Sequence, residues 1–449
     1  MRLGPRLVIA GTSSGVGKTT VATGLMAALR SAGHRVASAK VGPDYIDPGY
    51  HALATGRPGR NLDSWICGED AIGPLAARAG EGADLLVVEG VMGLFDGAAA
   101  DGPEASTASV ARLLDAPVVL VVDASAMSAS VAALVHGFAT WDPRCRLAGV
   151  VLNRVGSPGH ETLLREALAG LGVPVLGALR RDQALTWRDR HLGLVPVAED
   201  RSGVARRIEA LGEAVAAQVD LGAVVSLARA APPRAVDAPR TAERAGRATV
   251  AVAGGPAFSF VYQDNLEALS DAGAEIVAFD PTSDPALPSE ASALYVGGGF
   301  PEVFAEHLAG NLPLLADARR RVAGGLPTWA ECGGLLWLAS SLDGHPLAGV
   351  VPAEGRMTDR LSIGYRRATL LRPSPLGPAG TELRGHEHHY STLDPPGDGL
   401  ELAGRFGRGR AGWIGPSLFA SYVHLHLGGD PSPAERLVAA AGAVAPTTC

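Results

Sequence analysis

A glycine-rich loop near the N-terminus decides the fold of the first half of the chain. Residues 7–20 read LVIAGTSSGVGKTT, which is an apolar strand, a loop and the start of a helix. The spacing Gly11-x5-Gly17-Lys18-Thr19 is one residue longer than the phosphate-loop pattern G-x-x-x-x-G-K-[ST] and resembles a variant of it. Because strand, loop and helix follow in this order, a phosphate-binding loop explains the stretch better than a plain glycine-rich turn.

The chemistry of such a loop assigns a role to each of its parts. Its backbone N–H groups surround phosphate oxygens, and the N-terminus of the following helix attracts the same charge. Lys18 is then expected to neutralise the β- and γ-phosphates, and the Thr19 hydroxyl to ligate Mg²⁺. The residues predicted to bind ATP are Gly11, Thr12, Ser13, Ser14, Gly15, Val16, Gly17, Lys18, Thr19 and Thr20.

Apolar runs alternate with helical patterns after this loop. Near-continuous runs of this kind indicate an α/β fold with a parallel sheet covered on both faces. The predicted strands are Leu7–Ala10, Val36–Ala39, Leu85–Val88, Val118–Val122 and Val150–Leu152, and helices are expected at Thr19–Ala32 and Ser128–Thr140.

A stretch rich in Ala, Pro and Arg divides the chain into two domains. It begins near Ser226, and its apolar residues have no regular spacing, which is typical of a linker. We expect a first domain over 1–228, a linker over 229–247 and a second α/β domain over 248–449. The second domain begins with strand Thr249–Ala253, and its later parts, about 351–372 and 402–427, are strand-rich.

Composition excludes several classes of protein. The chain has 449 residues, 47% of them apolar, but no run long enough for a membrane span and no signal-peptide pattern, so a cytoplasmic protein without a membrane partner is expected. A net charge of −7 disfavours nucleic-acid binding. Of the 39 basic residues only Lys18 and Lys40 are lysines, which suggests that these two positions require a compact ammonium group.

Acidic residues follow the second and third predicted strands. Carboxyl ends of parallel strands share one edge of a sheet, where ligands collect. Lys40, Asp44, Tyr45 and Asp47 are therefore expected to contact the transferred phosphoryl group or the substrate. Thr19, Asp44 and Glu89 are predicted to hold Mg²⁺, with Glu89 as the acid that ends a strand in phosphoryl-transfer sites. Asp47 is an alternative to Asp44, since either acid could hold the metal or position the substrate. For Asp96 a helix cap is an equal alternative.

The second domain contains the pattern of a cysteine nucleophile. Cys332 follows Pro-Thr-Trp-Ala-Glu and precedes two glycines, as at a strand-to-helix elbow that exposes the sulfur and lowers the pKa of the thiol. His424 ends a distant apolar strand and is the expected base. Backbone N–H groups of Gly333, Gly298 and Gly299 are expected to form an oxyanion hole. Cys67, Cys145 and Cys449 show neither zinc nor disulfide spacing.

Together these motifs resemble the cobyrinic or hydrogenobyrinic acid a,c-diamide synthase family. That resemblance implies a P-loop domain of the dethiobiotin-synthetase type followed by a flavodoxin-like class I glutamine amidotransferase domain. It implies ATP-dependent amidation of the a and c acetates of a corrinoid, with glutamine as nitrogen donor, Mg²⁺ as cofactor and a homodimer as an open possibility. The matching stretches include KVGPDYIDP from residue 40, EGVMGLFDG from residue 89, GGGFPE from residue 297 and RGHEHHYS from residue 384.

One departure leaves the third catalytic group open. Many class I amidotransferases carry Glu two residues after the histidine, where this chain has His426. A histidine cannot orient its neighbour as a carboxylate does. His386, His388 and His389 are expected to contact substrate or to pack at an interface rather than to bind a metal.

Four alternatives remain. Two share the architecture: a diamidase of nickel sirohydrochlorin and cobyric acid synthase. A partition ATPase of the ParA/MinD type would give Cys332 no role and usually has a lysine at the loop start, where this chain has Gly-Thr-Ser. A non-catalytic regulatory protein would not need Cys332 and His424.

Overall fold

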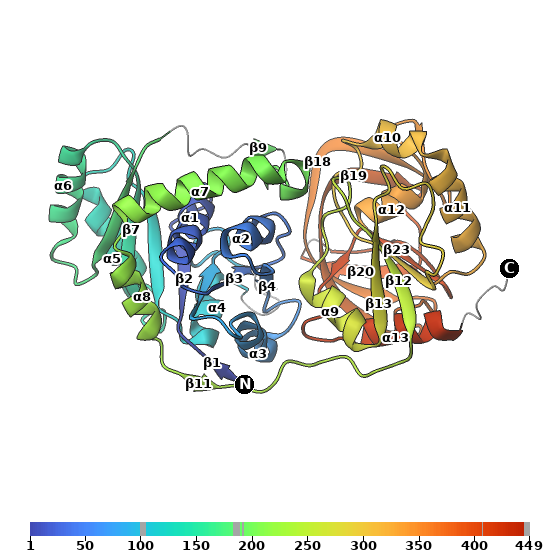
Figure 1. The fold of residues 1–449 in the computed structure, drawn as a ribbon, viewed down its shortest axis with the longest axis horizontal. Helices are drawn as coiled ribbons and strands as arrows, with labels where there is room; N and C mark the ends of the chain where they lie inside the picture. The colour runs from blue at the N-terminus through green and yellow to red at the C-terminus, as the bar shows by residue number, and fades with distance from the viewer. Residues whose placement is uncertain (99–104, 183–188, 191–192, 406, 444–449) are drawn as a thin grey trace. The chain divides into compact units, whose positions relative to one another are not determined.

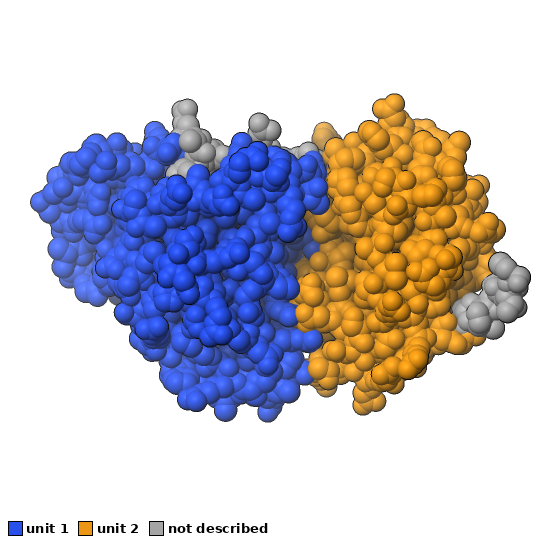
Figure 2. Space-filling model, in the orientation of Figure 1, with its two compact units in different colours: residues 1–239 blue, residues 240–449 orange. Residues whose placement is uncertain are grey.

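The computed structural model describes residues 1–98, 105–182, 189–190, 193–405 and 407–443. The chain forms two compact units, Met1–Pro239 and Arg240–Cys449 (Figure 2). The division after Pro239 falls inside the stretch predicted as a linker, 229–247. Cys449 lies outside the described residues.

Seven parallel strands form the sheet of the first unit, in the order β4-β3-β5-β2-β6-β7-β8 (Figure 1). The strands are β2 (Arg6–Gly11), β3 (Val36–Val41), β4 (Arg60–Leu62), β5 (Leu85–Glu89), β6 (Val118–Asp123), β7 (Leu147–Val155) and β8 (Val175–Arg180). The helices are α1 (Lys18–Ser31), α2 (Asp47–Thr55), α3 (Glu69–Ala79), α4 (Thr107–Leu114), α5 (Ser130–Thr140), α6 (Pro158–Leu168), α7 (Arg201–Gln218) and α8 (Leu221–Arg229). Shorter elements are β1 (Arg2–Leu3), β9 (Asp189–Arg190), β10 (Gly193–Leu194), the 3₁₀ helix η2 (Val197–Glu199) and β11 (Arg234–Ala235).

Helices cover both faces of this sheet, because its strands are apolar on both sides. Alternate residues such as Val8 and Ala10 pack with apolar residues of α3, α4, α5 and α6 in one core. On the other side α1 contacts β2, β3 and β5, while α7 contacts β8 and α8 contacts β2 and β5. This arrangement brings the carboxyl ends of β2, β3 and β5, adjacent strands of the sheet, to one edge.

The strands and helices predicted in the first half are all present, with ends shifted by at most three residues. The linker prediction was partly wrong. Residues from Ser226 to Arg229 continue helix α8, and Arg234–Ala235 forms β11, which pairs with β1. A sequence rich in Ala and Arg has high helix propensity, which lets α8 continue up to the first prolines.

The second unit contains two sheets. The first has the order β13-β12-β14-β15-β23-β22 and is parallel except for the last pair. Its strands are β12 (Ala248–Ala253), β13 (Ala274–Phe279), β14 (Ala293–Val296), β15 (Thr328–Glu331), β22 (Trp413–Gly415) and β23 (Leu418–Ser421). The second sheet consists of β16 (Ala339–Leu342), β17 (His345–Pro346), β18 (Val351–Leu370), β19 (Glu382–Asp394), β20 (Leu400–Gly404), β21 (Gly407–Ala411) and β24 (His424–Leu425).

Two apolar cores hold the second unit together, one on each face of its parallel sheet. Ala251, Leu294 and Ala330 share one core with residues of α11 and α12, and Tyr295 and Trp329 share the other with residues of α9, α13 and the second sheet. The helices of this unit are α9 (Gln263–Asp271), α10 (Ala305–Gly310), α11 (Leu312–Ala323), α12 (Gly333–Leu338) and α13 (Ser432–Ala443).

Candidate active site

The phosphate loop connects β2 to α1 in a conformation that needs glycine. Gly17 has a φ of 94°, in the left-handed region. A Cβ there would lie 2.1 Å from Nδ2 of Asn153, whose amide donates to the Val16 carbonyl at 2.8 Å. Arg154, itself at a φ of 59°, donates to the Gly15 carbonyl at 2.9 Å. The end of β7 therefore fixes the loop, and the sequence did not single out either residue for this role.

Lys18 lies folded back along the loop. Its Nζ donates to the Ser13 carbonyl at 2.9 Å, and the residue is 8% exposed. Burial lowers the pKa of Lys18 to about 8, and the charge of Lys40 adds to the effect. A phosphate bound in the loop would supply the negative charge that this partly desolvated ammonium lacks.

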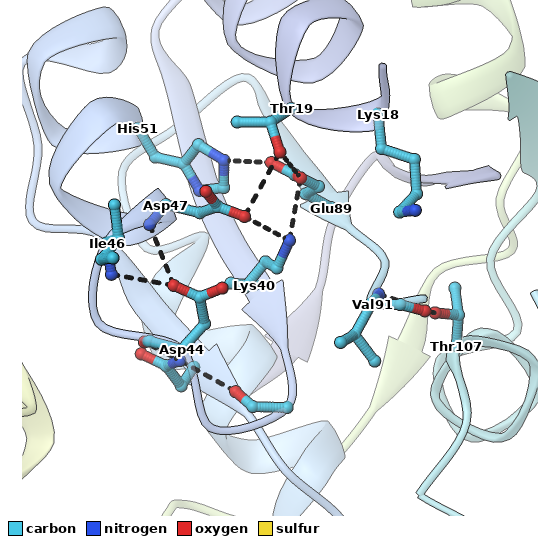
Figure 3. Close-up of polar contacts among 12 residues, drawn as sticks. Lys18, Thr19, Lys40, Asp44, Ile46, Asp47, His51, Glu89, Val91 and Thr107 are labelled. Atoms are coloured by element: carbon cyan, nitrogen blue, oxygen red, sulfur yellow. Dashed lines mark hydrogen bonds and ion pairs between the residues drawn. The ribbon is translucent and has the colours of Figure 1, made fainter. Parts of the chain in front are cut away.

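A buried cluster of charged groups lies beside the loop (Figure 3). Lys40 Nζ donates to Asp47 Oδ2 at 2.5 Å and to Glu89 Oε1 at 2.8 Å. His51 Nε2 is 2.6 Å from Glu89 Oε2, and the Thr19 hydroxyl donates to Glu89 Oε1 at 2.7 Å. Four different elements, β3, β5, α1 and α2, thus bring their polar groups to one point.

Mutual neutralisation sets the charges in this cluster. Burial alone would lower the pKa of Lys40, but the adjacent carboxylates Asp47 and Glu89 outweigh it and raise that pKa. Burial alone would raise the pKa of Glu89, but Lys40 and His51 hold it below its usual range. Burial, together with the nearby charge of Asp44, raises the pKa of Asp47 to about 7. Lys40 is therefore charged and Glu89 ionised, and the ammonium of Lys40 pairs with both acids.

The acids do not all lie where the sequence suggested. Asp44 Oδ1 accepts the N–H groups of Ile46 and Asp47, at 2.8 and 3.0 Å, in the turn that leads into α2. Asp47 is the acid beside Thr19, with 3.3 Å between its Oδ2 and the hydroxyl. Tyr45 is half-buried in the same turn.

His51 was missed as a member of the cluster. It lies four residues after Asp47, and on a helix that spacing puts two side chains on one face. The helical pattern of α2 therefore contained the signal.

The cluster fits a magnesium ion of the kind that binds with nucleotides. Among the described residues no group of three or more His, Cys, Asp and Glu side chains has the geometry of a metal site. Mg²⁺ bound with a nucleotide needs fewer, because it takes one or two carboxylates, waters and phosphate oxygens. Thr19 offers one hydroxyl, and the carboxylates of Asp47 and Glu89 both lie within hydrogen-bond distance of it.

Removal of the ammonium from this cluster should cost stability. Lys40→Met leaves Glu89 and Asp47 buried without their cation, and we expect the free energy of unfolding to fall by about 3–5 kcal/mol. The matched control is Arg35→Met, which breaks an exposed pair with Asp84 and should cost less than about 1 kcal/mol. Urea unfolding of the two variants measures both values. Equal losses of unfolding free energy in the two variants would show that the buried ion pairs of Lys40 contribute no more to stability than the exposed pair of Arg35.

Cys332 lies at a strained elbow in the second unit. It follows β15 and precedes α12 with φ 47° and ψ −100°, and its N–H donates to the Ser421 carbonyl at 2.8 Å. The sequence predicted this elbow correctly. The predictions that the elbow exposes the sulfur and lowers the pKa of the thiol were wrong. Cys332 is only 6% exposed, and burial, followed by the charge of Glu302, raises the pKa of the thiol despite a hydrogen bond from the Gly333 N–H.

The glycines predicted to form the oxyanion hole have different surroundings. The Gly298 N–H donates to the Phe260 carbonyl at 3.1 Å, so it already has a partner within the fold. Gly299 N lies 3.1 Å from the position that a Cβ on Gly333 would take, so these two backbones are in close contact. Gly298 instead makes room for the imidazole of His424, whose Cε1 would lie 2.4 Å from a Cβ at that position.

His424 is buried on β24, opposite His386 of β19. The two rings stack with their centroids 5.0 Å apart. Burial lowers the pKa of His424 to about 3, and the charges of His389 and His388 add to this. Both Cys332 and His424 are therefore neutral in the resting protein. The Gly297–Gly299 loop lies against His424 on one side and against Gly333, the residue after Cys332, on another.

The neighbouring histidines pack as aromatic rings. His389 stacks on Tyr422 at 3.8 Å, and its Nδ1 is 2.9 Å from the Ser391 carbonyl. Within the described residues, no three or more His, Cys, Asp or Glu side chains gather here as a metal site would require. His386 and His389 thus pack against rings within this unit, and the expected contact with substrate or packing at an interface stays a prediction.

Two protein-family models match the chain, one in each half. Residues 7–195 match the family described as CobQ/CobB/MinD/ParA nucleotide binding domain, and residues 249–432 match the CobB/CobQ-like glutamine amidotransferase domain. Hydrogenobyrinate a,c-diamide synthase of Streptomyces coelicolor is 49% identical, with 97% of each chain covered. The chain belongs to the a,c-diamide synthase family.

Other relatives of the a,c-diamide synthase family match over similar lengths. The hydrogenobyrinate a,c-diamide synthase of Thermobifida fusca is 50% identical over 97% of this chain and 96% of its own. The cobyrinate a,c-diamide synthase of Syntrophotalea carbinolica is 44% identical over 97% of this chain and 98% of its own. None of the helices within the described ranges is long and apolar enough to cross a membrane.

Proposed function

We propose that this protein uses ATP and glutamine to convert the a and c acetate carboxylates of hydrogenobyrinic acid into carboxamides. The observation that carries this proposal is the 49% identity to the Streptomyces synthase over 97% of both chains. The two sites supply the chemistry that such a reaction needs. A phosphate loop accounts for activation of a poor acyl donor, and a Cys–His site accounts for ammonia made from glutamine. The domain limits and the cytoplasmic location expected from the sequence stay predictions, and a homodimer stays an open possibility.

A metal-free ring is the favoured acceptor. The compared relatives named for hydrogenobyrinate are 47 to 50% identical to this chain. Those named for cobyrinate, which contains cobalt, are 40 to 44% identical. Each of the compared relatives named for hydrogenobyrinate is thus more identical to this chain than each of those named for cobyrinate. This favours hydrogenobyrinic acid as the substrate.

Activation proceeds at the phosphate loop. A carboxylate oxygen of the substrate attacks the γ-phosphorus of ATP, the bond to the β-phosphate oxygen breaks, and ADP leaves. Lys18 and the loop N–H groups stabilise the charge on the transferring group. Lys40 is already paired with Asp47 and Glu89, so its role is to hold these acids in place. Thr19, Asp47 and Glu89 would hold Mg²⁺, which neutralises phosphate charge when bound.

Amide formation completes the reaction. Ammonia attacks the carbonyl carbon of the acyl phosphate, and inorganic phosphate leaves. Ammonia in free solution is mostly ammonium at neutral pH, so local release from glutamine provides the reactive form.

Glutamine hydrolysis proceeds at Cys332. The sulfur attacks the side-chain amide carbon while His424 accepts the thiol proton and passes it to the departing ammonia. N–H groups of Gly333 and Gly299 would face the developing oxyanion. Water then hydrolyses the thioester. Because the thiol and imidazole are both neutral at rest, proton transfer accompanies attack instead of preceding it.

A substrate comparison tests this assignment. With ATP, Mg²⁺ and glutamine, the protein should amidate hydrogenobyrinic acid with a kcat/KM at least about tenfold above that for cobyrinic acid, the scale of one specific contact difference. Product masses by liquid chromatography measure both reactions. Preference for the cobalt ring would correct the acceptor. Turnover of nickel sirohydrochlorin alone would place the protein with the related diamidase, and ATP hydrolysis without any amide product would favour a partition-type ATPase.

A further inference from the structure

Glu331 is a fully buried carboxyl group directly before the nucleophile Cys332. It ends strand β15 and has no exposed surface. Its Oε1 accepts the N–H of Leu425 at 2.8 Å and the indole N–H of Trp329 at 3.0 Å. Its Oε2 accepts the hydroxyl of Tyr295 at 3.1 Å and lies 3.9 Å from Nδ1 of His424.

A carboxyl group in such a position needs an explanation. Burial of an acid is unfavourable, and here it raises the pKa of Glu331 to about 8, although Leu425, Tyr295 and Trp329 all donate to it. An apolar residue would fill the same space in the core without this penalty. Strongly perturbed acids are concentrated at functional sites. The group that Glu331 faces is the base of the Cys–His site.

In other class I amidotransferases, the residue two positions after the histidine orients the base. In this chain that residue makes other contacts. His426 occupies the position two residues after His424. Its Nδ1 accepts the N–H of Gly428 at 3.1 Å, and its Nε2 is 3.7 Å from Asp264 Oδ2. Its ring packs 4.4 Å from that of Tyr262. His426 is thus engaged with α9 and the turn after β24.

We propose that Glu331 is the positioning residue for His424, and that it replaces from the nucleophile's own strand the carboxylate that other class I amidotransferases carry after the histidine. The inference rests on the proposed hydrolysis of glutamine at Cys332. It completes the site as Cys332, His424 and Glu331, with the third group supplied by β15.

The contacts of Glu331 act on His424 in two ways. The bond from Leu425 N–H fixes the backbone next to the histidine, so the imidazole begins from a set position. The approach of Oε2 to Nδ1 assigns that nitrogen to the carboxyl group and leaves Nε2 for the proton of Cys332. A separation of 3.9 Å is longer than a hydrogen bond, and such contacts commonly shorten when substrate binds.

Charge formation strengthens the pair during the reaction. When His424 accepts the thiol proton, it becomes an imidazolium, and the carboxylate of Glu331, which accepts hydrogen bonds from three donors, stabilises that positive charge. His386 stacks on His424, and positive charges on His388 and His389 would oppose its protonation. Glu331 is an acidic group placed to favour the imidazolium.

Glu331→Gln tests the role with little change in volume. We expect kcat for glutamine hydrolysis to fall by about 10²- to 10⁴-fold, as when an orienting carboxylate is replaced by its amide, with KM for glutamine changed less than about threefold. Ammonia-supported amidation by the same preparation should stay at the wild-type rate. Glu331→Asp restores the carboxylate and should recover part of the lost kcat. His426→Gln is the matched control at the neighbouring buried position and should hydrolyse glutamine at close to the wild-type rate.

Each other outcome overturns the inference. Wild-type kcat in Glu331→Gln would show that the carboxyl group is not needed. Equal loss of the glutamine- and ammonia-supported reactions, or a loss in His426→Gln as large as in Glu331→Gln, would show that the residue only supports the fold. If Glu331→Gln does not fold, a Glu331→Asp variant with no activity above that of Cys332→Ser contradicts the role. Failure of the wild-type protein to hydrolyse glutamine would instead refute the proposed function itself.

Discussion

Cys332→Ser should abolish amidation supported by glutamine and leave amidation supported by ammonia. The hydroxyl of serine is a far weaker nucleophile than the sulfur, and His424, whose pKa is about 3 in this buried site, is a weak base for activating it. We expect the glutamine-supported rate to fall by at least about 10³-fold, as for loss of a catalytic nucleophile. Parallel assays with glutamine and with ammonium chloride at alkaline pH measure the two rates.

A second cysteine provides the control for that experiment. Cys67 is half-buried in the first unit and has no place in either site, so Cys67→Ser should keep both rates. Continued use of glutamine by Cys332→Ser would remove this residue from the mechanism. Loss of both rates would mean that Cys332 supports the fold more than the reaction.

Lys18→Ala should lower amide formation and leave glutamine hydrolysis intact. The ammonium lies along the phosphate loop next to the Ser13 carbonyl, where it would contact the transferring phosphoryl group. Removal of one such donor typically lowers kcat by about 10²- to 10³-fold. Amide formation should fall by this factor with either nitrogen source, while glutamine hydrolysis at Cys332 continues. Product mass and glutamate release, measured in the same samples, separate the two activities.

Lys18→Arg sharpens the test, because it keeps the charge but changes its shape. A Cβ added at Gly11 would lie 2.9 Å from Cγ and Cδ of Lys18, which shows how closely the loop encloses the side chain. A guanidinium group is broader than an ammonium, so Lys18→Arg should lose amide formation too. Normal amide formation by Lys18→Ala would exclude the proposed activation step.

The sequence was most informative about the sheet and the elements that converge on it. Val/Leu runs predicted the parallel strands, and the rule that parallel strands end at one edge predicted that Lys40 and Glu89 lie close together. Asp47 and His51 were harder to assign, because the choice between Asp44 and Asp47 depends on where α2 begins. Asp44 Oδ1 bonds the N–H groups of Ile46 and Asp47, which fixes the turn and turns Asp47 toward Thr19.

The second site shows what a linear pattern cannot reveal. The order of Cys332 and His424 predicted a Cys–His pair, but the pKa of the thiol depends on burial by segments far away in the sequence. The role of Gly298 was likewise hidden, since its N–H is taken by Phe260. Glu331 lies on the same face of β15 as Trp329, as strand alternation predicts, but the sequence does not reveal that Leu425 and Tyr295, both distant in the chain, meet it there.

Isotope counting tests the division between the two sites most directly. Wild-type protein is incubated with hydrogenobyrinic acid, ATP, Mg²⁺, glutamine labelled with ¹⁵N at its side-chain amide, and unlabelled ammonium at neutral pH. If Cys332 supplies the nitrogen and the a and c acetates accept it, the product carries two ¹⁵N amides and its formation requires ATP. A product with unlabelled amides, or labelled amides formed without ATP, would contradict the account.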